Sequence, residues 1–121
     1  MVAETKRRRK IVVDGRSYMW RIKDSNDPAG WLCWSYELVV ASEDRRFYAN
    51  YPILPKGELP FIWITGKEFK PTPPHPDNKY RCPRFEREDG AITPQSVKGL
   101  IQWCLSDGEP KIRVDWNNKP I

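Results

Sequence analysis

The side chains that could perform acid–base or metal chemistry do not form a catalytic pattern in this sequence. His75 is the single histidine and lies among prolines, so serine–histidine pairs, cysteine–histidine pairs and multi-histidine metal sites are not predicted. Glu86, Glu88 and Asp89 could pair as carboxylates, but they alternate with arginines as in a solvated loop. A glycine-rich phosphate loop is absent. We predict a chain without enzymatic activity, with no cofactor, no metal ion and no small-molecule substrate.

The cysteines do not predict a disulfide or metal framework either. Cys33, Cys82 and Cys104 are odd in number and far apart, so neither paired bridges nor a CxxC metal site can be drawn from them. Cys33 and Cys104 lie in apolar runs and are expected to be buried. Cys82 is expected to lie in a loop and to be the most reactive of the three.

Basic residues gather at the amino-terminal end. Eight of the 21 lysine and arginine residues lie within the first 23 positions, together with only two acidic residues. Such a cluster can neutralise phosphates, with Met19 or Tyr48 available to contact bases, or it can be a solvated tail. The candidate anion-binding or nucleic-acid-binding residues are Lys6, Arg7, Arg8, Lys10, Arg21 and Lys23.

The segment from Ile92 to Gly108 has a full helical signature. Thr93 can cap the first turn, Pro94 suits the first helical position, and Gly108 suits the left-handed position that ends a helix. Apolar residues at helical spacing predict one buried stripe, formed by Val97, Leu100, Ile101, Cys104 and Leu105.

Trp103 points away from that stripe, and Gly99, one turn earlier, leaves a shallow gap beside it. A tryptophan in this position is either covered by a loop of the same chain or exposed for a partner. Trp103 and Gly99 are therefore the candidate residues for binding another protein.

A hairpin is predicted at the start of the chain. Asp14-Gly15 suits a two-residue type I′ turn between alternating segments. The turn sets the register, with Ile11 opposite Tyr18 on the buried face. The basic side chains then fall on the other face, where Arg8 would lie opposite Arg21, an unfavourable pair of like charges.

The rest of the chain predicts a small α+β domain. Strands are expected at 34–40, 46–51 and 111–116, the last with Ile112, Val114 and Trp116 facing inward. Eight of the twelve prolines lie between them, within 52–84, and predict a proline-rich excursion in which 61–65 is a short strand or an apolar latch. We expect a twisted antiparallel sheet of about five strands with one helix on one face, in the order β-β-β-β-(proline-rich loop)-α-β.

The chain resembles a group of small uncharacterised bacterial proteins. The resemblance covers both ends of the chain, in the hairpin Val-Val-Asp-Gly-Arg-Ser-Tyr-Met-Trp-Arg, the strand from Trp34 to Val40 and the helix start Ile92-Thr93-Pro94. Those proteins share an Ile-Thr-Pro sequence before a short helix that ends at a glycine. The resemblance implies a bacterial source and no particular activity.

These features predict one domain over 1–121, with 1–9 a basic, partly disordered arm. The length suits a single core, and the sequence offers no secretory or membrane-spanning segment, so a cytoplasmic location is expected. We predict a non-catalytic binding module, with an unknown protein as its partner and no membrane contact. The alternative is an accessory protein that binds nucleic acid through its basic hairpin.

Overall fold

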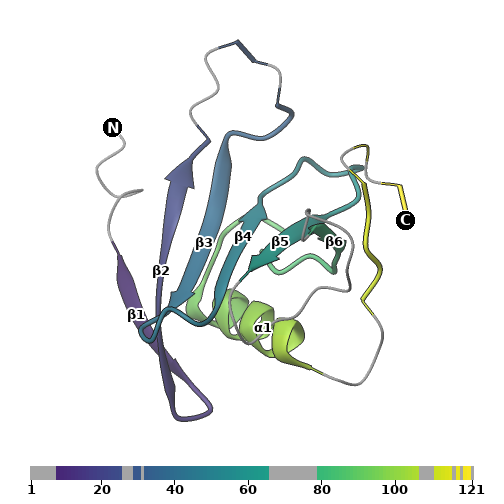
Figure 1. Cartoon of the computed structure of the whole chain (residues 1–121). Coiled ribbons are helices and arrows are strands. Elements are labelled where there is room, and N and C mark those ends of the chain that lie inside the picture. Colours follow the sequence, from purple (N-terminus) through teal and green to yellow (C-terminus); the bar gives the residue numbers. More distant parts are fainter. Residues whose placement is uncertain are drawn as a thin grey trace.

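A computed structural model describes residues 8–25, 29–30, 32–65, 79–106, 111–115, 117 and 119–120. Its elements are six strands followed by one helix: β1 (Arg9–Val13), β2 (Arg16–Asp24), β3 (Tyr36–Ser42), β4 (Tyr48–Pro52), β5 (Phe61–Thr65), β6 (Lys79–Arg81) and α1 (Pro94–Leu105). The strands form one antiparallel sheet in chain order, and α1 lies across one of its faces (Figure 1). The predicted α+β class is confirmed.

The first hairpin has the predicted turn and register. Asp14 and Gly15 have φ values of 51° and 79°, as a type I′ turn requires. Val13 pairs with Arg16, and Ile11 pairs with Tyr18. The pairing begins at Arg9 and Trp20, one step inside the position at which two arginines would oppose each other. The strand therefore ends where like-charge repulsion would begin.

Helix α1 begins as its sequence predicts. Thr93 accepts a hydrogen bond from the Ser96 amide, the Ser96 hydroxyl accepts one from the Thr93 amide, and Pro94 follows the cap. Ser106 caps the carboxyl end, and Gly108 lies outside the described residues. Most of the predicted stripe is buried, although Leu105 is 39% exposed because the helix ends there.

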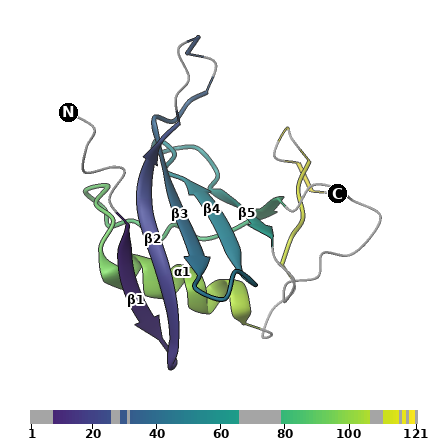
Figure 2. The same ribbon diagram turned by 60° about the vertical axis from the view of Figure 1, so that its left-hand side comes forward.

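The core lies between α1 and the sheet, and Figure 2 shows the helix beneath the first four strands. The sheet residues that contact the helix lie side by side in rows across the strands, because the register pairs them. One row contains Trp20, Val40, Ala49 and Ile64, all 5% exposed or less. Val97, Leu100 and Ile101 of the helix are fully buried against this face. One helix thus provides the second layer that the apolar face requires.

The strand count and order differ from the prediction. The sheet has six strands in the described part of the chain, because β5 and β6 both form within the proline-rich excursion. The predicted strand at 111–116 is replaced by isolated bridges from Arg113 to Tyr80 and from Val114 to Pro120. Val114 is buried, but Ile112 is 48% exposed, contrary to the prediction. Trp116 lies outside the described residues.

Two cysteine predictions are wrong. Cys33 is exposed, whereas Cys82 is buried beside the core. Burial raises the pKa of the Cys82 thiol, and it raises that of Cys104 to about 12. Both thiols stay protonated at neutral pH, so neither is an activated nucleophile.

Within the described residues, no helix has the length and apolar character needed to cross a membrane.

Candidate functional site

The sheet face opposite α1, here called the outer face, carries the basic side chains of the first hairpin. Strand alternation places Lys10 on this face. Lys10 pairs with Met19 of β2, so Met19, Arg21 and Lys23, which alternate along β2, lie on the same face. Arg8 comes just before β1, two residues before Lys10, so it lies on the same side of the sheet. Lys6 and Arg7 lie outside the described residues. Four of the six predicted anion-binding residues therefore share one surface.

A pocket of about 500 Å³ lies on this surface. Met19, Val39 and Ala41 form its apolar floor across β2 and β3. Its lining also includes residues of the turn between β3 and β4 and the start of β4. The polar members of the lining are Arg8, Arg21, Ser42, Glu43 and Arg45, and its aromatic members are Trp20, Phe47 and Tyr48.

The cations of the pocket are available for a ligand. Arg8, Arg21 and Arg45 form no ion pair with any acidic group in the described part of the chain. The acid of the pocket, Glu43, pairs with Lys10 at 3.6 Å between Oε1 and Nζ, and both side chains are about half exposed, at 48% and 58%. An exposed pair of this length is weak. The pocket therefore has an excess of positive charge.

Two apolar side chains complete the surface. Tyr48, the first residue of β4, is 41% exposed and lies opposite Ala41. Met19 is half-buried in the same cross-strand row. A phenol ring and a thioether next to unpaired guanidinium groups can bind a flat apolar group and a neighbouring anion together.

The turn between β3 and β4 is fixed by Ser42 and Asp44. Asp44 accepts hydrogen bonds from the Ser42 hydroxyl at 2.5 Å, the Arg46 amide at 3.1 Å and the Arg16 guanidinium at 3.0 Å. These bonds lower the pKa of the Asp44 carboxyl to about 2. The turn that carries Glu43 and Arg45 is thus held to β2 through Arg16.

The other end of the outer face is closed by aromatic rings. Trp34, Phe61 and Trp63 pack together, with Phe61 and Trp63 centroids 4.9 Å apart. Lys79 is 6% exposed, with its Nζ 3.9 Å from the Phe61 centroid. Glu37 accepts hydrogen bonds there from Trp34 at 2.8 Å and from Asn50 at 3.0 Å. This end is packed with its own side chains.

Trp103 lies on the helix side of the molecule and is partly buried. The Phe85 ring packs against it at 6.1 Å between centroids, and Lys111 Nζ is 5.1 Å from its ring centroid. A Cβ atom added at Gly99 would lie 4.0 Å from Phe85 Cδ1, so Phe85 occupies the predicted gap. Loop residues of the same chain therefore cover part of the predicted protein-binding position.

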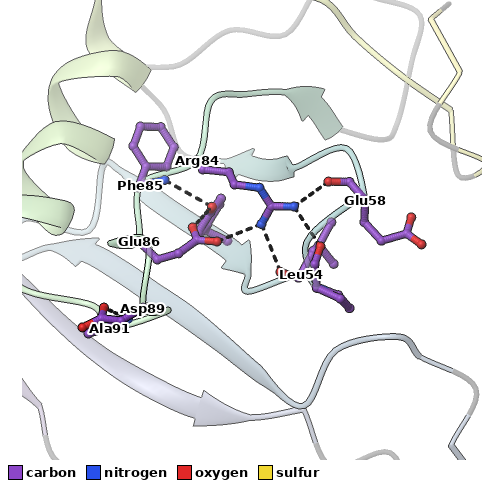
Figure 3. A network of polar contacts seen from close by, with 9 residues as sticks. Leu54, Glu58, Arg84, Phe85, Glu86, Asp89 and Ala91 are labelled. Carbon is purple, nitrogen blue, oxygen red and sulfur yellow. Dashed lines mark hydrogen bonds and ion pairs between the residues drawn. The ribbon is translucent and has the colours of Figure 1, made fainter.

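Glu86, one of the three carboxylates considered for acid–base chemistry with Glu88 and Asp89, has a structural role. It accepts hydrogen bonds from the buried Tyr51 hydroxyl and from Arg84, at 2.9 Å for the latter (Figure 3). The Phe85 amide donates to the Tyr51 oxygen at 3.2 Å. Burial and then the bond to Glu86 raise the Tyr51 pKa. The Glu86 side chain is only 6% exposed and has little access for a substrate.

No family model, curated protein or solved structure matches this chain. The site must therefore be interpreted from its own geometry. Among the described residues, no group of three or more histidine, cysteine, aspartate or glutamate side chains is arranged to hold a metal ion.

Glu43 and Arg45 are site residues that the sequence pattern did not predict. Both lie in a segment predicted only as a short connection between strands. The β2–β3 register brings that segment beside the first hairpin, where the Glu43 amide donates to the Ser17 carbonyl at 3.1 Å. The only signal in the sequence was the charge of the turn itself.

Proposed function

We propose that this protein binds single-stranded nucleic acid, without catalysis, in the pocket on its outer face. The observation that supports the proposal is that three arginines, without acidic partners in the described chain, line the same pocket as the exposed ring of Tyr48. Guanidinium groups bind phosphates as charge-assisted donors, and a tyrosine ring stacks on an unpaired base. Bases inside a duplex are already stacked, so the pocket favours a single strand.

The alternative of a protein partner has weaker support. It depended on Trp103 and Gly99, whose environment is accounted for by Phe85 and Lys111. The charged side chains that line the outer-face pocket are three arginines and one glutamate, whereas protein interfaces are usually depleted of charge at their centres. We therefore favour an anionic polymer over an apolar protein surface.

The proposal is tested by fluorescence anisotropy with a labelled single-stranded DNA of mixed sequence. Three phosphate contacts predict that log K falls with log salt with a slope of about −2, since each contact on a single strand contributes about −0.7. Arg21→Gln should reduce the size of that slope by about 0.7. Tyr48→Ala should remove about 1–3 kcal/mol of binding free energy through lost stacking.

Matched variants separate the pocket from general charge and aromatic content. Lys98→Gln removes a positive charge from the exposed side of α1, and Tyr36→Ala removes a ring that is 44% exposed and outside the pocket lining. Both should bind as the unaltered protein does. Equal losses of oligonucleotide affinity in the pocket variants and the control variants, or an affinity independent of salt, would contradict the proposal.

A further inference from the structure

We infer that the pocket selects a guanine base through Glu43 and Lys10, an inference that rests on the proposed function. Glu43 is the acidic residue of a pocket whose other charged lining groups are Arg8, Arg21 and Arg45. A site that bound only phosphates would gain nothing from a carboxylate, which repels them. A carboxylate beside a stacking ring does suit the N–H groups of a base edge.

The positions of Glu43 and Lys10 are set by the sheet. The Glu43 amide donates to the Ser17 carbonyl at 3.1 Å, which fixes its backbone to β2. Lys10 comes from β1, where it pairs with Met19 of the pocket floor. The Glu43 Oε1 and Lys10 Nζ atoms are 3.6 Å apart. Because the contact is long and both side chains are exposed, both retain hydrogen-bonding capacity for a ligand.

An ammonium group next to a carboxylate complements the Watson–Crick edge of guanine. That edge presents the acceptor O6 followed by the donors N1–H and N2–H. Lys10 can donate to O6 while the two Glu43 oxygens accept from N1–H and N2–H. Thymine and uracil offer one donor between two acceptors, and cytosine and adenine place an acceptor beside their amino group. In each of those bases one carboxylate oxygen would face a base acceptor or have no donor, which disfavours binding.

The same pocket can accommodate the rest of the nucleotide. Its volume of about 500 Å³ is within the range of small-ligand sites. The ring of Tyr48 provides the stacking surface, and Arg8, Arg21 and Arg45 of the same lining can bind the flanking phosphates. Base selection and backbone binding are thus assigned to different side chains.

The test compares labelled thymidine oligonucleotides of about eight residues, a typical single-strand site size. One contains only thymine, one contains a central guanine and one contains a central inosine, which lacks the N2 amino group. We expect the guanine oligonucleotide to bind at least about fivefold tighter than the all-thymine one. Inosine should fall between them, because it retains O6 and N1–H.

Glu43→Gln should remove the preference for guanine, because the amide replaces one of the two accepting oxygens with an NH2 donor that would face a donor of the base. Glu88→Gln removes an exposed carboxylate outside the pocket lining and should retain the preference. The comparison of three oligonucleotides on the unaltered protein does not depend on the folding of any variant.

The outcomes distinguish this inference from the proposed function. Equal affinity for guanine and thymine oligonucleotides, or a preference that persists in Glu43→Gln, would overturn the guanine site and leave single-strand binding intact. Failure of the unaltered protein to bind any of the oligonucleotides would overturn both.

Discussion

At the scale of single residues, Arg45 combines an unfavourable backbone with a place in the candidate site. Its φ of 61° lies in the left-handed region, which costs a residue with a side chain about 1–2 kcal/mol. The bonds of Ser42 and Asp44 to the Arg46 amide, at 3.2 and 3.1 Å, hold the turn in this form. Glycine would suit this backbone better, so we interpret Arg45 as a residue whose charge serves the proposed site.

This interpretation predicts a separation of stability from binding. Arg45→Gly relieves the backbone strain but adds flexibility to the unfolded chain, so its free energy of unfolding should stay within about 0.5 kcal/mol of the unaltered protein. Arg45→Val should lose about 1–2 kcal/mol, because a branched side chain fits this conformation poorly. Urea unfolding measures both, and oligonucleotide affinity should fall in both. A glycine variant that is much less stable would contradict the argument.

At the scale of elements, one arginine organises the segment that follows β4. Arg84 donates to the carbonyl oxygens of Leu54 at 3.0 Å, Pro55 at 2.8 Å and Glu58 at 2.7 Å, and its fourth partner is the carboxylate of Glu86 (Figure 3). Proline provides no amide for sheet pairing, so this segment has few backbone bonds of its own. Side-chain donors replace them and join the excursion to the approach to α1.

Arg84→Met is therefore predicted to lower the free energy of unfolding by about 2–3 kcal/mol, since the buried carboxylate of Glu86 would lose its cation. The matched control is Arg87→Met, which breaks an exposed pair with Asp89 at 3.8 Å. Its cost should be below about 0.5 kcal/mol. Chemical denaturation followed by circular dichroism compares them. Similar costs for the two variants would show that the network does not have this role.

At the scale of the whole molecule, stability depends on the contact between the sheet and α1. The apolar sheet face spans several strands, and the single described helix covers it. A sheet of this kind cannot remain folded with that face in water, so the helix and the sheet should unfold together. Among the described residues, no helix covers the outer face of the sheet.

Leu100→Ala should cost about 2–5 kcal/mol, because Leu100 is fully buried in this layer. Leu105→Ala, at the exposed end of the same helix, should cost less than about 1 kcal/mol of unfolding free energy, since leucine and alanine have similar helix propensities. Unfolding by tryptophan fluorescence and by circular dichroism should coincide in both variants. Separate transitions would show that the helix and the sheet are independent units.

The local elements of this protein follow from short-range patterns in its sequence. The first hairpin, its register and the start of α1 follow from turn and capping residues acting over a few positions, and all are present as predicted. Tertiary structure decided the features that depend on distant pairing. Strand β6 has three residues and gains its place by pairing with β5, and the fold buries Cys82 beside it. The pocket likewise needs β1, β2, β3 and the following turn together, because Glu43 and Arg45 reach the basic hairpin only through the β2–β3 register. Short-range steric and hydrogen-bonding preferences are encoded residue by residue, whereas a concave charged surface exists only after separate segments have packed.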